Sequence, residues 1–257
     1  MKPLRRWPAY LYVFLVLFFL YAPLLIMILM GLNRSPLYTL PIEFDLVWYK
    51  ALFHNERLLQ AGLNSVLLGV AVALTATLLG TLAAWALART RFRGRSLLQV
   101  LLIPPITIPW LIIAIALLLM FFWLGIPRGM FAMYLGHVGV TLPYVILLMS
   151  ARLQGSDPDL EDAARSLGAG PVTAFLRVTL PLILPGVIGA LLFTFTISFD
   201  NFILSHFLAP PGVSTLPVEI YSAIRKGFTP EINAISSIIF LFSGGLILLA
   251  SRRIDFF

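Results

Sequence analysis

Residues 157–181 read DPDLEDAARSLGAGPVTAFLRVTLP and form a polar, helix-forming segment inside an otherwise apolar chain. Four apolar residues in its first half follow the i, i+3, i+4, i+7 spacing of one helix face: Leu160, Ala163, Ala164 and Leu167. Because two of the four are alanines, this face is shallow, and we expect it to sit in a groove of another protein. We call these four residues the docking face.

The segment also carries the signals that begin and end short helices. Asp157 is predicted to cap the first helix, with Pro158 in its first position and acids in its first turns, where they offset the helix dipole. Gly168 is predicted to end this helix, and a second helix is predicted to begin at Pro171 and to end before Leu180. A helix lying on lipid would carry basic residues opposite bulky apolar anchors. Acids and alanines favour a protein partner instead.

The composition of the whole chain is that of a membrane protein. Of its 257 residues, 60% are hydrophobic and 11% are charged, whereas soluble domains carry about 25% charged residues. The net charge of +7 does not indicate nucleic-acid binding, because the arginines lie in short loops between apolar runs. The absence of cysteine excludes disulfides and thiolate metal sites, and we predict no metal or cofactor site in the chain.

Six apolar stretches approach the roughly 20 residues that a membrane helix needs. They are residues 9–32, 61–88, 97–124, 130–151, 182–208 and 234–250. The first is too long for a signal-peptide core and is predicted to be an uncleaved helix. Pro104, Pro105 and Pro109 are expected to kink or unwind the third stretch. We therefore predict an all-α membrane protein with six transmembrane helices in a single transmembrane domain, residues 1–257.

The distribution of basic residues predicts the orientation in the membrane. One set of loops, which contains both chain ends and the loop of residues 152–183, holds twelve of the 18 lysines and arginines. By the positive-inside rule, both termini and this loop are predicted to be cytoplasmic. A phosphate-binding loop needs a lysine directly after a glycine. The chain has three lysines, Lys2, Lys50 and Lys226, and none of them follows a glycine. The chain is therefore not expected to be an enzyme, and any ATP hydrolysis must come from another subunit.

The loop resembles the EAA loop of ABC-importer permeases. The matching residues are Glu161, Ala163, Ala164, Gly168, Leu180 and Pro181. Asp162 either interposes between the glutamate and the alanines or stands for the first acidic position of the pattern. The resemblance implies a type I ABC-importer permease fold and a loop that docks on a cytoplasmic ATPase, whose subunits hold ATP and Mg²⁺. The implied coupling residues are Leu160, Glu161, Asp162, Ala163, Ala164, Leu167 and Gly168.

One acidic residue lies inside an apolar stretch. A carboxylate at membrane depth is costly unless it faces water or a partner, so Asp200 is a candidate for a substrate pathway, with Asn201 and Ser198 beside it. The alternative is an aspartate near the outer end of its helix, paired with an arginine or a helix end. His137 and His206 are too isolated for a metal site and are expected to form hydrogen bonds within the helix bundle.

Beyond the loop, nearly the whole chain resembles the second permease of spermidine/putrescine importers. The matching stretches are residues 91–95 (RFRGR), 198–207 (SFDNFILSHF) and 216–234 (LPVEIYSAIRKGFTPEINA). The resemblance implies a bacterial inner-membrane location, a homologous permease as heterodimer partner, two ATPase subunits and an extracytoplasmic solute-binding protein. It also ties Trp48, Glu161 and Asp200 to polyamine uptake, although the position of Trp48 in an outer loop favours an interfacial anchor over a lip of the pathway.

Two departures from the polyamine pattern leave the substrate open. Asn201 stands where a second aspartate is expected, and Ile106 stands where another acid is expected. A less cationic organic solute therefore stays an alternative. Outside the class of importer permeases, the candidates are an ion-coupled secondary transporter and a membrane-embedded enzyme. The enzyme is disfavoured because the sequence offers no nucleophile–base pair or metal cluster at membrane depth.

Overall fold

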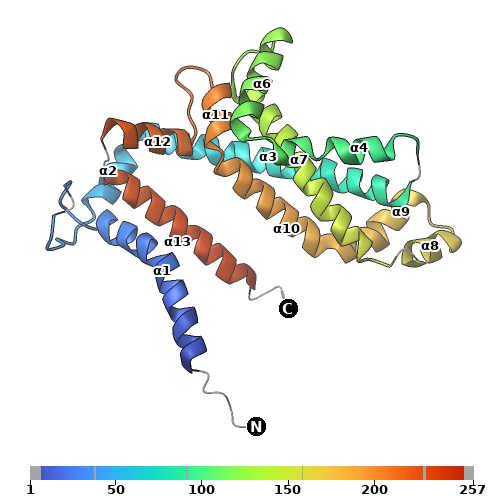
Figure 1. Cartoon of the computed structure of the whole chain (residues 1–257), viewed down its shortest axis with the longest axis horizontal. Helices are drawn as coiled ribbons and strands as arrows, with labels where there is room; N and C mark the ends of the chain where they lie inside the picture. Colours follow the sequence, from blue (N-terminus) through green and yellow to red (C-terminus); the bar gives the residue numbers. More distant parts are fainter. Residues whose placement is uncertain (1–6, 38, 91, 158, 228–229, 252–257) are drawn as a thin grey trace. The chain divides into compact units, whose positions relative to one another are not determined.

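The computed structural model describes residues 7–37, 39–90, 92–157, 159–227 and 230–251, and all regular elements in this part of the chain are helices. The prediction of an all-α protein is therefore confirmed for these residues. The chain forms two compact units, one from Met1–Leu59 with Ile220–Phe257 and one from Gln60–Glu219. Figure 1 shows the order of the helices along the chain.

The first unit is built from helices at the two ends of the chain. Helix α1 (Trp7–Gly31) packs along α13 (Glu231–Ser251), which also packs against α2 (Val47–His54). The side chain of Asn55, just after α2, donates a hydrogen bond of 2.9 Å to Glu231 in the first turn of α13. Most side chains of α1 are exposed and apolar, as expected of a helix that faces lipid.

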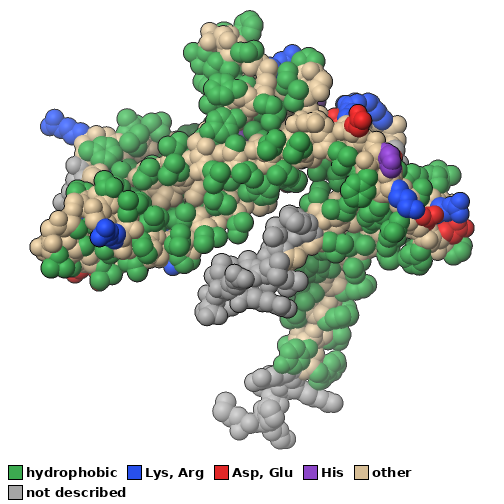
Figure 2. Space-filling model, turned by 180° about the vertical axis from the view of Figure 1, so that it is seen from behind, with side chains coloured by type: hydrophobic (Ala, Val, Ile, Leu, Met, Phe, Trp, Pro, Cys, Tyr) green, Lys and Arg blue, Asp and Glu red, His purple; other side chains and the backbone are tan. Residues whose placement is uncertain are grey.

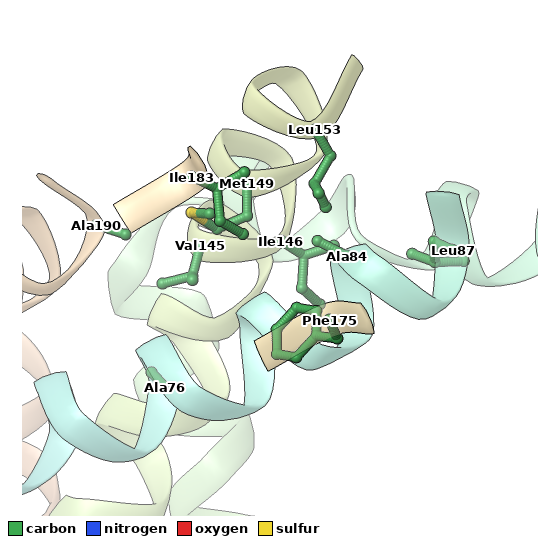
Figure 3. Close-up of a cluster of buried hydrophobic side chains, with 10 residues drawn as sticks. All are labelled: Ala76, Ala84, Leu87, Val145, Ile146, Met149, Leu153, Phe175, Ile183 and Ala190. Carbon is green, nitrogen blue, oxygen red and sulfur yellow. The ribbon is translucent and has the colours of Figure 1, made fainter. Parts of the chain in front are cut away.

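The second unit has a core between three long helices. These are α3 (Glu56–Arg89), α7 (Met130–Gln154) and α10 (Leu180–Phe199), and their apolar side chains meet in the cluster drawn in Figure 3. A Cβ atom at Gly80 would lie only 2.5 Å from Cγ1 of Val145, so glycine lets α3 and α7 approach closely. Apolar side chains also cover most of the face of the molecule shown in Figure 2.

The third apolar stretch is broken, as its prolines predict. It forms α4 (Arg95–Leu101), α5 (Pro104–Thr107) and α6 (Trp110–Trp123), and the helix axes before and after the break differ by 111°. The break falls where Ile108 is extended, with ψ of 135°. Proline disfavours the helical conformation of the residue before it and has no N–H to donate, so Pro109 explains the position of the break.

Four helices in the described part of the chain are long and apolar enough to cross a membrane: α1, α3, α7 and the continuous helix Pro171–Phe199. The bent pair Arg95–Thr107 and Trp110–Trp123 adds a fifth if it forms one span. In the sixth predicted stretch the described apolar helix is shorter, Glu231–Leu241. Membrane-spanning helices are thus confirmed, while six spans and cytoplasmic termini stay predictions.

Two predicted boundaries around the fifth stretch are wrong. The second helix of the loop does not end before Leu180, because α9 (Pro171–Ala174) continues through the π-helix η1 (Phe175–Thr179) directly into α10. The wider π-turn lies just before Pro181, where it accommodates a residue that has no N–H for the regular ladder.

The stretch predicted as one helix over residues 182–208 is also interrupted. Helix α10 ends at Phe199, and the separate helix α11 (Phe202–Leu208) follows. The side-chain oxygen of Asn201 accepts a hydrogen bond of 2.9 Å from the backbone N–H of Leu204 and so caps α11. The capping side chain explains why a new helix begins here although the sequence stays apolar.

Candidate functional site

The loop of residues 152–183 has the local structure that its sequence predicts over its first helix. Asp157 lies just before α8 (Asp159–Ser166), and its carboxylate accepts a hydrogen bond of 2.9 Å from the N–H of Asp159. The helix ends at Ser166 and is followed by a turn in which Gly168 has φ of +91°. The N–H of Ala169 donates to the carbonyl of Ala164 at 3.1 Å. Only glycine adopts this left-handed conformation at little cost. Pro158 lies outside the described residues.

The docking face lies on the surface of the chain. The side chain of Leu167 is 90% exposed and that of Leu160 is 47% exposed. Ala163 between them is exposed, and Ala164 is half-buried. Exposed apolar surface of this kind, on a helix with polar neighbours, is typical of an interaction site.

Glu161 lies outside the docking face and is buried, with 2% of its surface exposed. Its Oε2 atom accepts hydrogen bonds from Arg89 Nε at 3.0 Å, Thr179 Oγ1 at 2.9 Å and Trp85 Nε1 at 3.5 Å. Its Oε1 atom accepts a hydrogen bond from Arg165 Nη2 at 2.6 Å. These five residues, which we call the Glu161 cluster, join α8 to the end of α3 and to η1.

The electrostatics of the cluster favour a charged glutamate. Burial by itself raises the pKa of Glu161, but hydrogen bonds from Thr179, Arg89 and Trp85 and the positive charge of Arg89 together lower the pKa below its ordinary value. A buried carboxylate is stable only when it is paired and hydrogen-bonded in this way. The cluster therefore fixes α8 to the helices of the second unit.

The Glu161 cluster rests directly on the apolar core. The ring of Trp85 lies 4.7 Å from the ring of Phe175, measured between centroids, and Phe175 belongs to the core cluster of Figure 3. The contacts of α8 therefore continue without a gap into well-packed core side chains.

The lowered pKa of Glu161 predicts how stability depends on pH. A carboxyl whose pKa is lower in the folded than in the unfolded chain stabilises fully above its unfolded value, about 4.5, and this stabilisation is lost as pH falls through the lower folded value. We expect the stability difference between the wild type and Glu161→Gln to be constant above about pH 6 and to shrink below about pH 4.5. Thermal unfolding of the purified protein from about pH 7 to about pH 3 measures it. A difference that does not change with pH would contradict the assignment.

The second candidate site is a hollow of about 520 Å³ at the break between α10 and α11, which we call the Asp200 hollow. Its lining residues are Trp110, Thr196, Ile197, Asp200, Asn201, Phe202 and Ile203. The side chain of Asp200 is exposed there. The carboxylate of Asp200 could hold a cation by its charge, and the rings of Trp110 and Phe202 could do so by their aromatic faces.

Of the other predicted pathway residues, Asn201 lines the Asp200 hollow, whereas Ser198 and Trp48 do not. Ser198 is buried and its hydroxyl lies 2.8 Å from Nδ1 of His137, while Nε2 of His137 lies 3.3 Å from the hydroxyl of Ser205. The prediction that His137 forms hydrogen bonds within the bundle is thus confirmed. Trp48 belongs to the first unit, where its indole N–H donates to the carbonyl of Asn33 at 2.7 Å.

Sequence reasoning missed several members of both sites. Trp110 and Thr196 line the Asp200 hollow, and Arg89 and Thr179 hold Glu161. Arg89 did carry a signal, because an arginine at the end of a long apolar stretch is well placed to meet an acid in a neighbouring loop. No signal pointed to Thr179, because its segment is predicted to be a helix separate from the fifth span.

The fold and the loop together define a helical membrane protein with an exposed face for a partner. Residues 76–256 match the family described as "Binding-protein-dependent transport system inner membrane component", and the chain belongs to this family.

Its relatives include polyamine permeases. The spermidine/putrescine transport system permease protein PotC of Haemophilus influenzae is 36% identical over 93% of both chains. PotC of Escherichia coli strain K12 is 36% identical over 88% of this chain and 85% of its own length. The putrescine transport system permease protein PotI of the same strain is 36% identical over 92% of this chain and 87% of its own.

Solved structures show the same fold. A chain of a bacterial ABC transporter involved in the import of the acidic polysaccharide alginate matches with a TM-score of 0.75 over 100% of this chain and 98% of its own, at 18% identity. A bacterial alginate ABC transporter in complex with an alginate pentasaccharide-bound periplasmic protein contains a chain that matches with a TM-score of 0.74 over 97% and 95%, at 21% identity. At this identity the likeness establishes the fold.

Proposed function

We propose that the chain is the permease subunit of an ATP-driven importer that moves spermidine, putrescine or a related cation across the bacterial inner membrane. The observation that carries the proposal is the 36% identity to PotC and PotI proteins over about nine tenths of the chain. In this proposal the chain forms six spans of a type I importer and has both termini in the cytoplasm. A homologous permease completes the pathway, and a solute-binding protein delivers the substrate from outside.

The loop supplies the coupling in this proposal. Two ATPase subunits outside the chain bind ATP and Mg²⁺ and hydrolyse ATP, and the docking face of α8 sits in a cleft of one of them. The exposure of Leu160 and Leu167 supports this role, since both side chains are accessible to a partner protein. The Glu161 cluster then transmits the movement of α8 to α3 and to the helix that leads into α10.

The Asp200 hollow supplies one contact to the substrate in this proposal. A polyamine carries an ammonium group at each end, and a carboxylate beside an aromatic face binds such a group by charge and by the cation–π interaction. Asp200 and Trp110 offer this pair in the hollow. Asn201 cannot add the second negative charge expected at this place, because its side chain is neutral and caps α11.

Neutralising Asp200 tests the pathway. We expect Asp200→Asn to reduce spermidine uptake by at least about tenfold, since a charge-assisted contact contributes roughly 1.5–3 kcal/mol and about 1.4 kcal/mol corresponds to a factor of ten. Uptake of radiolabelled spermidine into proteoliposomes with ATP inside and the solute-binding protein outside measures this. Glu43→Gln, which neutralises an exposed acid of the first unit, is the matched control and should transport normally. Unchanged uptake in Asp200→Asn would remove Asp200 from the pathway.

The energy source distinguishes this proposal from an ion-coupled transporter. We expect uptake to stop when ATP is depleted from the proteoliposomes and to continue when a proton ionophore collapses the pH gradient. Uptake that survives ATP depletion and follows the proton gradient would contradict the proposed function. Binding assays of the solute-binding protein with spermidine, putrescine and neutral solutes would then identify the substrate. The same assays test the alternative that the substrate is another organic solute.

A further inference from the structure

The second unit contains a polar hollow of about 190 Å³ beside the Glu161 cluster, where the ends of α3 and α7 meet the start of α4. We call it the arginine hollow. Six polar residues line it: Arg89, Arg95, Gln99, Ser150, Gln154 and Ser156. The rest of its lining is apolar, and it includes two guanidinium groups but no aspartate or glutamate among the described residues.

The charges of the two arginines are compensated differently. Arg89 uses its Nε atom to donate to Glu161 at 3.0 Å, and its Nη atoms donate no hydrogen bond to a described residue. The side chain of Arg95 is half-buried and forms no ion pair or hydrogen bond with the described part of the chain. Because Glu161 also pairs with Arg165 at 2.6 Å, its single negative charge does not compensate both guanidinium groups that line the hollow.

The available donors fit a tetrahedral anion. Guanidinium groups bind phosphate oxygens through paired N–H donors, and the amide groups of Gln99 and Gln154 and the hydroxyl of Ser150 add neutral donors around the same space. A carboxylate ligand has only two acceptor oxygens and would therefore use fewer of these donors. Both guanidinium groups are positive and line one hollow, so an anion bound there offsets their mutual repulsion.

The location fits a ligand at the membrane edge. The hollow lies at the ends of two long apolar helices, where a lipid headgroup can reach it, and basic pockets between membrane helices bind anionic headgroups. We propose that the arginine hollow binds a phosphate group, supplied by the headgroup of an anionic phospholipid or by a free phosphate compound. The site does not depend on the proposed transport function.

The occupied hollow would support the Glu161 cluster. Arg89 belongs to both sites. When a phosphate pairs with Arg95, Arg89 can stay paired with Glu161. Occupancy is therefore expected to raise the stability of the chain as well as to retain the ligand.

Lipid retention by the purified full-length chain tests the proposal. Native mass spectrometry after incubation with dioleoylphosphatidylglycerol or dioleoylphosphatidylcholine measures the bound lipid, and thermal unfolding with and without inorganic phosphate, at constant ionic strength set with chloride, measures the free anion. We expect the wild type to retain the phosphoglycerol lipid in preference to the choline lipid. Arg95→Gln should reduce retention at least about tenfold, since one charge-assisted contact is lost.

Two further variants keep the test decisive. Arg93→Gln removes a charge from the same loop but from a residue that does not line the hollow, and it should behave as the wild type. Gln154→Glu keeps the side-chain shape and puts a negative charge into the hollow, so it should lose the ligand as Arg95→Gln does.

Each outcome then decides the matter. Loss of phosphoglycerol lipid in Arg95→Gln and Gln154→Glu alone supports the proposal with a lipid as the source. Stabilisation by inorganic phosphate in the wild type, lost in the same two variants, supports it with a free phosphate as the source. Equal retention and equal stabilisation in the wild type and all three variants would overturn it.

Discussion

Glu161→Ala is expected to abolish transport and to destabilise the chain strongly. The substitution leaves the guanidinium of Arg89 nearly buried without its carboxylate, since only 18% of that side chain is exposed. Removing one partner of a buried ion pair costs about 3–5 kcal/mol, and Thr179 also loses the acceptor of its buried hydroxyl. Thermal unfolding of the purified chain and spermidine uptake in proteoliposomes measure the two effects.

Two companion variants separate the coupling role of Glu161 from its role in stability. Asp162→Ala removes the neighbouring exposed acid and should leave the unfolding temperature unchanged. The double variant Glu161→Leu with Arg89→Leu removes both charges, so most of the lost stability should return. If Glu161 positions the loop, ATP hydrolysis in the double variant will no longer be stimulated by the loaded binding protein. A double variant that transports normally would show that the cluster serves stability alone.

Ala163→Glu is expected to prevent the ATPase subunit from binding. Ala163 is exposed in the middle of the docking face, so a carboxylate there changes neither the core nor the Glu161 cluster, but it places a charge in the apolar part of the proposed contact. A desolvated, unpaired charge costs several kcal/mol at an interface. Co-purification with the tagged ATPase subunit should fall to background while the unfolding temperature of the chain alone stays the same.

The control for this prediction lies on the same helix. Ser166→Glu adds an equal charge to an exposed residue outside the docking face and should leave co-purification intact. Because the chain has no cysteine, Leu167→Cys gives a single thiol at the most exposed position of the face. The ATPase subunit should protect this thiol from a maleimide. Equal labelling with and without the subunit, together with normal co-purification of Ala163→Glu, would place the contact elsewhere.

The features that the sequence predicted correctly are local ones. Asp157 and Gly168 determine the ends of α8 through the conformation of a few neighbouring residues, and Pro109 breaks its helix for the same kind of reason. The apolar spacing of the docking face likewise predicted a surface that the structure leaves exposed.

The features that the sequence did not predict depend on contacts between distant residues or on an unusual helix. The carboxylate of Glu161 meets Arg89, 72 positions earlier in the chain, and helix periodicity carries no information on such a pair. The π-helix η1 lets the chain continue helically past Pro181, although proline is ordinarily a stop signal. Glu161 and Asp162 also could not be distinguished until burial separated them.

The unbroken helix from Pro171 to Phe199 has a mechanical consequence. It spans 29 residues, so at about 1.5 Å per residue it is about 43 Å long, and the part from Thr179 to Phe199 alone is about 30 Å, the thickness of the hydrocarbon layer. Thr179 at one end holds Glu161, and Asp200 follows the other end. If the part from Thr179 to Phe199 moves as one rod, a tilt of about 10° at the loop displaces its far end by about 5 Å.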